Sequence, residues 1–93
     1  MQDIKWKDSI TSSFSGATIN NYVLTVVVQP QYATMHSDVT YTLSKFDNNA
    51  LIKRETLRVS ERDCCNEGMT PLCMGKQEVE AELAIHRILS DDI

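Results

Sequence analysis

The most constraining feature of this sequence is the run Tyr22–Val28, Tyr-Val-Leu-Thr-Val-Val-Val. Successive residues of a strand point to opposite faces of its sheet, so this run places apolar side chains on both faces. The pattern predicts a central strand, from about Ile19 to Gln29, that is covered above and below and stops before Pro30. In a chain of 93 residues, covering such a strand leaves little room for an enclosed active site.

The segment before this strand carries weaker patterns. Residues 4–7 predict a short strand with Ile4 and Trp6 on one face, because these two apolar residues alternate with lysine. Residues 9–18 are small and polar and predict a loop or an irregular edge. No internal repeat is visible, and the length favours a single domain over residues 1–93.

The segment after the central strand predicts a hairpin. Residues 38–44 alternate between apolar and polar side chains, as a half-buried strand requires. Residues 47–49, Asp-Asn-Asn, predict the turn, because Asn and Asp tolerate left-handed backbone angles. Residues 61–75 are expected to form a long connection. On the return strand, one face holds Leu51, Leu57 and Val59 together with Lys53 and Glu55. The expected core contacts of that face are Leu57 and Val59.

Residues 77–89 fit two patterns. As a strand, apolar residues alternate with glutamates as far as residue 85. As a helix, Val79 and Leu83 fall outside the apolar arc, but Glu, Ala and Leu dominate the composition and favour helix over strand. The residues of the helical apolar arc, expected to pack on the sheet, are Ala81, Ala84, Ile85, Ile88 and Leu89.

These elements predict an α+β fold, a small antiparallel sheet of three to four strands with the C-terminal helix on one face. The alternative is an all-β sandwich or barrel of five strands. In the α+β fold, the other face of the sheet is covered by the segment of Ile4, Trp6 and Phe14, or by a partner. A second copy in that position would make the protein a homodimer.

Charge is distributed unevenly along the chain. The net charge is −4, and residues 63–93 hold seven carboxylates against the two basic residues Lys76 and Arg87. An acidic third of this kind favours contact with a basic surface of a larger protein and argues against direct binding of nucleic acid. The residues expected to bind the partner are Glu78, Glu80, Glu82, Asp91 and Asp92.

A second charged set lies on the expected return strand. Arg54, Arg58 and Arg62 recur every four residues, which places them on one face of a strand. No aromatic side chains are interleaved with them, so the pattern is a poor match to a platform for single-stranded nucleic acid. These arginines are expected to pair with carboxylates of the same chain or of a neighbouring copy.

Three cysteines form the other cluster with possible chemistry. Cys64, Cys65 and Cys73 could bind zinc together with His36 or His86. The two adjacent cysteines and the absence of paired C-x-x-C motifs argue against such a site. The interpretation favours reduced thiols that bind no metal, one of them packed as a small hydrophobic group.

The letters of a catalytic triad also occur, as His36, Ser37 and Asp38. Consecutive residues in extended chain point to alternate sides and cannot form the proton relay. The sequence therefore predicts no catalytic residues, no metal site and no cofactor, and a protein that is not an enzyme.

The expected compartment is the cytoplasm, including that of a host cell. The first residues do not resemble a signal peptide, no apolar stretch is long enough to span a membrane, and the odd number of cysteines fits reduced thiols. The size and acidity resemble those of small accessory proteins of phages and mobile elements, a class too diverse to imply one function.

Three functions remain open from the sequence. The first is a non-catalytic binding module, such as an accessory or inhibitor protein, whose acidic C-terminal third docks on a nucleic-acid-binding surface of a larger protein. The second is a structural subunit of a homo-oligomer or virion, in which the arginines of one copy meet the glutamates of another. The third is a small thiol or zinc enzyme.

Overall fold

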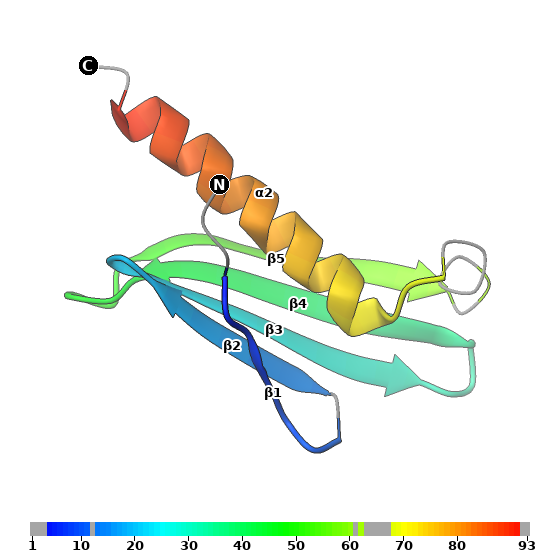
Figure 1. Ribbon diagram of the computed structural model, residues 1–93. Helices are drawn as coiled ribbons and strands as arrows, with labels where there is room; N and C mark the ends of the chain where they lie inside the picture. Colours follow the sequence, from blue (N-terminus) through cyan, green and yellow to red (C-terminus); the bar gives the residue numbers. More distant parts are fainter. Residues whose placement is uncertain (1–3, 12, 61, 63–67, 92–93) are drawn as a thin grey trace.

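The computed structural model describes residues 4–11, 13–60, 62 and 68–91, which contain one antiparallel sheet with a long helix lying across it (Figure 1). Each strand pairs with the next one along the chain, so the sheet order is β1-β2-β3-β4-β5. The elements are β1 (Lys7–Asp8), β2 (Phe14–Ile19), β3 (Tyr22–Gln31), β4 (His36–Lys45), β5 (Leu51–Ser60) and α2 (Pro71–Asp91).

The expected antiparallel sheet and C-terminal helix are confirmed, but the expected number of three to four strands is wrong. The sheet has five strands, which is the number in the all-β alternative, and the helix over residues 71–91 distinguishes the fold from that alternative. β1 and β2 account for the difference. They lie where the sequence predicted a short strand at residues 4–7 and a loop at residues 9–18.

β2 was missed because its residues are small and carry no apolar pattern. It pairs with β3 along its whole length, from Phe14 opposite Val27 to Ile19 opposite Tyr22. The turn between the two strands is Asn20-Asn21, and Asn20 adopts a positive φ of 54°. An asparagine with this backbone angle is the usual means of closing a two-residue hairpin, so the turn was readable from the sequence although the strand was not.

α2 covers only one face of the sheet, across β3 and β4 (Figure 1). The covered face of β3 turns Leu24 and Val26 toward the helix, whereas Val27 on the opposite face is 43% exposed. No described element lies over that opposite face. The prediction of a central strand covered above and below is therefore wrong, and β3 also continues past Pro30 to Gln31. The buried core consists of Leu24, Val26, Val39, Tyr41, Leu43, Val59, Leu72, Val79 and Leu83.

The helix begins well before residue 77, inside the stretch expected to be a connection. Thr70 caps its N-terminus, because the Thr70 Oγ1 accepts a hydrogen bond of 3.2 Å from the backbone N–H of Cys73. Pro71 follows at the first helical position, where its missing N–H leaves no intrahelical bond unmade. A Thr-Pro pair of this kind is typical of the start of a helix, although residues 61–75 were expected to be a connection.

The buried side of α2 is the opposite of the one expected. Leu72, Val79 and Leu83 are buried against the sheet, and this stripe extends back to the first turn of the helix. The expected apolar arc covers only the last turns and faces away from the sheet. The helix is longer than predicted, and the stripe of Leu72, Val79 and Leu83 runs along more of its length than the expected arc does. This longer stripe therefore packs against the sheet. The arc residues Ala81, Ala84, Ile85, Ile88 and Leu89 are all exposed.

The hairpin of β4 and β5 was predicted correctly except for one irregularity. The turn at residues 47–49 is confirmed, and Asn49 has a positive φ of 57°. The register shifts between Leu43 and Ser44, and such a bulge moves the following side chains to the other face. As a result Ile52 packs against the core, while Leu51, expected on the same face as the core contacts Leu57 and Val59, is exposed.

We expect opposite results from two neighbouring substitutions in β3. Val26→Asp buries an unpaired charge and should abolish cooperative unfolding, because a domain of this size has a stability of only about 5–15 kcal/mol. Val27→Asp places the charge on the uncovered face, and we expect it to melt within a few degrees of the parent. Thermal denaturation followed by circular dichroism measures both. Equal loss of structure in the two variants would contradict a one-sided sheet.

The closest approach of helix to sheet gives a second prediction. A Cβ on Gly75 would lie 2.5 Å from Val26 Cγ1 and 2.6 Å from Val39 Cγ1, so the helix backbone sits directly on the core. Gly75→Ala should therefore lower the melting temperature by several degrees. Overpacking of the core lowers the free energy of unfolding by roughly 1–3 kcal/mol, which exceeds the gain of up to about 1 kcal/mol from the higher helix propensity of alanine. Gly16→Ala is the control, since its nearest contact is an ordinary 3.5 Å. An unchanged melting temperature for Gly75→Ala would mean that the helix shifts freely.

Candidate protein-binding surface

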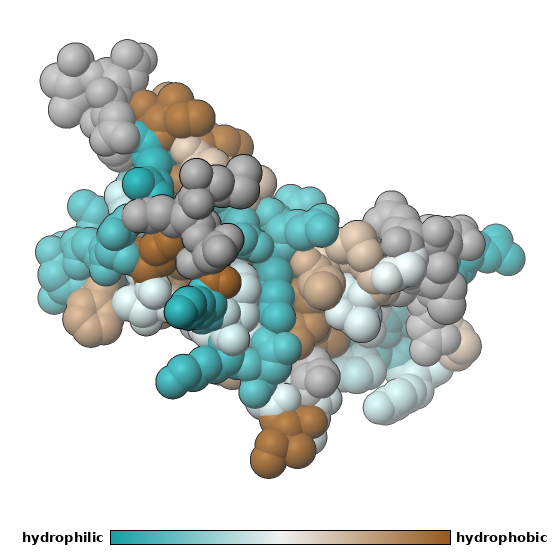
Figure 2. All heavy atoms as spheres, in the orientation of Figure 1, coloured by the Kyte–Doolittle hydropathy of each residue, from teal (hydrophilic) through white to brown (hydrophobic). Residues whose placement is uncertain are grey.

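The solvent side of α2 carries an apolar stripe formed by Ala81, Ala84, Ile85 and Ile88, called here the outer stripe. Helical residues three and four apart lie on one side, which places these four in line opposite the core-facing Val79 and Leu83. Ile85 is 53% exposed and Ile88 is 68% exposed. Figure 2 shows hydrophobic residues gathered at the C-terminal end of the helix, which extends beyond the sheet in Figure 1.

The three glutamates expected to bind a partner lie along the two flanks of the outer stripe. Glu78 and Glu82 are one helical turn apart on one flank, and Glu80 lies on the other. Glu78 is exposed, whereas Glu80 and Glu82 are half-buried. Asp91 is the last residue of α2, and Asp92 lies outside the described residues.

Glu82 leans toward the sheet as well as toward solvent. Burial raises the pKa of the Tyr41 phenol, and the negative charge of Glu82 raises it further. A 3.2 Å contact with Glu55 raises the pKa of Lys53, and the Glu82 charge adds to that effect. Glu82 therefore contributes to the electrostatics of the β5 side of the helix, and the charge of Glu78 adds a smaller effect on the pKa of Tyr41.

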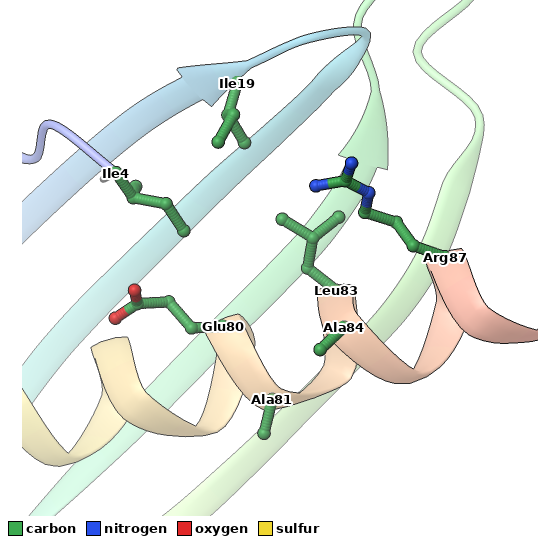
Figure 3. Close-up of a pocket in the computed structure, with 7 residues that line it drawn as sticks. All are labelled: Ile4, Ile19, Glu80, Ala81, Leu83, Ala84 and Arg87. Atoms are coloured by element: carbon green, nitrogen blue, oxygen red, sulfur yellow. The ribbon is translucent and has the colours of Figure 1, made fainter. Parts of the chain in front are cut away.

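A groove of about 390 Å³ runs beside the outer stripe, between α2 and the N-terminal segment (Figure 3). Ile4 and Ile19 form its sheet side, and Leu83 lies on its helix side. The side chains of Glu80 and Arg87 both project from the helix around this hollow. The groove is lined by Ile4, Ile19, Glu80, Ala81, Leu83, Ala84 and Arg87, so it shares two alanines with the outer stripe.

The uncovered face of the sheet, called here the open face, is the second exposed surface. Cross-strand partners share a face, and one row of partners crosses the whole sheet from Lys7 through Gly16, Thr25 and Thr42 to Arg54. Lysine thus stands at the β1 edge of the open face and arginine at the β5 edge.

Arg58 also lies on the open face, since it pairs with Asp38, and its Nε is 3.5 Å from the Asp38 carboxylate. The sequence was therefore right to place Arg54 and Arg58 on one strand face. Arg62 is exposed but lies beyond the end of β5, so it does not continue that row. The expected pairing of these arginines with acidic side chains of the same chain holds for Arg58, through Asp38.

Between its charged edges, the open face is lined by threonine and apolar side chains. The row next to the one above contains Phe14, Val27, Thr40 and Thr56, and the hydroxyls of the two threonines are 3.0 Å apart. Phe14 and Val27 are both more than 40% exposed. A hollow of about 480 Å³ lies beside β1, near Gly16, which has no side chain to fill it.

A polar cluster fixes the β1 edge to the helix on the covered face. Lys76 Nζ lies 2.8 Å from the Asp8 carboxylate and 5.7 Å from the centre of the Trp6 ring. The hydroxyl of the fully buried Ser15 donates to the same carboxylate oxygen, at 2.5 Å. The hydrogen bond from Lys76 has the largest effect on the pKa of Asp8, followed by the one from Ser15, and together they hold this pKa below its ordinary value. This cluster is structural, because it ties β1, β2 and α2 together.

Those residues considered for chemistry that the structure describes do not assemble into a site. His36, Ser37 and Asp38 lie at the start of β4, where consecutive side chains alternate. Cys73 is exposed on the first turn of α2, and Cys64 and Cys65 lie outside the described residues. His86 packs edge-on against Tyr22, with ring centres 5.5 Å apart. Among the described residues, no three His, Cys, Asp or Glu side chains gather in a geometry that could hold a metal ion.

Comparisons with protein-family models, with curated proteins and with solved structures returned no match to this chain. In the described part of the chain, no helix combines the length and the apolar character that crossing a membrane requires. The functional argument therefore depends on the two exposed surfaces. Sequence reasoning identified the glutamates and two arginines, but it missed Lys7 and Phe14, whose position on the open face depends on the unrecognised strand β2.

The polar cluster predicts how stability depends on pH. Asp8 has a lowered pKa in the folded protein, so its ion pair stabilises the fold above the ordinary value of 3.8 and is lost as the pH falls through the lower folded value. The difference in melting temperature between the parent and Asp8→Asn should be constant near neutral pH and should shrink below about pH 4. Lys76→Met should show the same trend. A difference that persists unchanged in strong acid would contradict this account.

Proposed function

We propose that the protein is a non-catalytic protein-binding module that docks through α2 on a basic surface of a larger protein. The observation that supports this proposal is the outer stripe, an exposed apolar line with glutamates along both flanks. Contiguous exposed apolar surface of this kind, rimmed by polar residues, is typical of interaction sites. Such a module acts in the cytoplasm, where its thiols stay reduced.

The two components of the surface serve different steps of binding. Glu78, Glu80 and Glu82 attract a basic partner and raise the association rate at low salt. Burial of Ile85 and Ile88 then slows dissociation, because apolar area is removed from water. Basic surfaces with this requirement include those that bind nucleic acid, so docking there would block access to the nucleic acid.

A second candidate function is a structural subunit of a homo-oligomer. The observation that favours it is the distribution of charge over the two layers, with glutamates on the outside of the helix and Lys7, Arg54 and Arg58 on the open face. A protein with complementary surfaces on opposite sides can stack on copies of itself.

Capture of partners from a lysate of the source cell, at low and at high salt, tests the docking proposal. The test variant is Glu78→Gln/Glu80→Gln/Glu82→Gln, and the control is Asp38→Asn/Asp47→Asn/Glu55→Gln, which changes the net charge equally but lies on the strands and turns. We expect the parent and the control to retain one defined basic protein at low salt, and the test variant to lose it with its circular dichroism spectrum unchanged. Equal capture by both variants would contradict the proposal.

A further inference from the structure

We infer that the outer stripe of one copy of this chain packs on the open face of the sheet of a second copy. This inference rests on the second candidate function and deepens it, because it names the two surfaces that meet and assigns a role to the apolar residues of each. The fold leaves two surfaces uncovered on opposite sides of the molecule. The inference follows because these surfaces match in width, in charge and in apolar content.

The widths of the two surfaces agree. Neighbouring strands lie about 4.8 Å apart, so the open face measures roughly 19 Å from β1 to β5. An α-helix with its side chains is about 10–12 Å across. A helix seated along the middle strands therefore covers β2, β3 and β4 and leaves a rim a few ångströms wide at each edge. The basic residues of the open face lie at these two edges, and Asp38 lies on β4 beside Arg58.

The charges on the two rims are opposite to those on the flanks of α2. The β1 edge presents Lys7, and the β5 edge presents Arg54 and Arg58. A docked helix presents glutamates on both of its sides. Glu78 and Glu82 lie on one side, and Glu80 lies on the other, which it shares with Arg87. Each rim of one copy thus receives a carboxylate from the other, which is the complementarity that orients two surfaces during association. Asp38 is the acidic residue of this face that already contacts Arg58.

Apolar groups occupy the middle of both surfaces. Val27 is exposed on the central strand of the open face with Phe14 beside it at the start of β2, and Ile85 and Ile88 are exposed along the outer stripe. The hollow of about 480 Å³ beside Gly16 provides room for one bulky side chain from the helix. Ala81 and Ala84 on the stripe let the helix backbone approach the sheet closely, as Gly75 does on the covered side.

Two copies joined helix to helix fit these observations less well. A symmetric pair of α2 helices would bring glutamates of one copy beside glutamates of the other, and like charges across an interface oppose association. It would also leave the open face uncovered. The helix-on-sheet contact buries both exposed surfaces with one interaction.

The contact joins two different surfaces, so each copy has one helix and one sheet face to offer. Contacts of this type do not close by two-fold symmetry and produce chains or rings of copies. We therefore expect the average mass to rise steadily with protein concentration, past that of a dimer. Binding of a partner to α2 competes with this self-association, because both use the outer stripe.

Analytical ultracentrifugation of the purified full chain over a range of concentrations, at low salt, tests the inference. The sheet variant is Arg54→Glu/Arg58→Glu and the helix variant is Ile85→Ser/Ile88→Ser. The control is Tyr32→Ser/Phe46→Ser, which removes two exposed apolar groups located just past the ends of β3 and β4. We expect the sheet and helix variants each to raise the concentration needed for association at least tenfold, and the control to behave like the parent.

A mixing experiment adds a positive result. Glu78→Arg/Glu82→Arg alone should remain monomeric. Mixing it with the sheet variant should restore association, because each helix then meets a sheet of opposite charge: the reversed pair matches, and so does the unaltered pair. All variants are checked by circular dichroism and melting temperature, so that loss of fold is recognised.

Three outcomes would overturn the inference. A parent that stays monomeric at every concentration shows that the surfaces do not meet. An association that stops at the dimer and ignores the sheet variant shows a helix-to-helix contact. Association lost in the sheet variant but kept in the helix variant shows that the open faces meet each other. Partner capture separates this inference from the proposed function, because the sheet variant should keep the partner while losing self-association.

Discussion

The arrangement of the whole fold depends on the contact between α2 and the sheet at Gly75. The backbone at this position lies against Val26 and Val39 with no room for a side chain between them. Helix and sheet can approach this closely only with glycine at the contact, and the approach fixes which side of the helix is buried. Leu72, Val79 and Leu83 then fall into the core, and the remaining apolar residues of α2 are left on the solvent side.

Because α2 packs on only one face of the sheet, the fold leaves two surfaces uncovered, the outer side of the helix and the opposite face of the sheet. The helix turns a glutamate-flanked apolar stripe outward, and the sheet turns outward a face of threonine and apolar residues with basic edges. A lone charged face would be explained by solubility. An apolar centre combined with opposite charges on the two surfaces is instead what association requires, and it links the proposed docking function to self-association through the same helix.

The sequence predicted a strand correctly where one of its faces is buried and the alternation of apolar and polar residues is regular. The alternation of residues 38–44 and the turn at residues 47–49 located the β4–β5 hairpin correctly. Sequence reasoning failed for β2, whose buried Ser15 and Ala17 are too small to show a hydrophobic pattern. It also placed Leu51 on the face of Leu57 and Val59, and the bulge reverses that alternation. The glutamates of the candidate surface were identified from composition, whereas Lys7 and Phe14 needed the pairing of β1 and β2 to be recognised.

The sequence by itself determined the antiparallel sheet, the C-terminal helix and the acidic character of that helix, because these follow from local period, propensity and charge. Only the tertiary structure decided which stripe of α2 is buried and which face of β3 remains open. Both stripes of the helix and both faces of the strand are apolar, so local pattern does not distinguish them. The choice came from packing between distant residues, Gly75 against Val26 and Val39, which no local window of sequence contains.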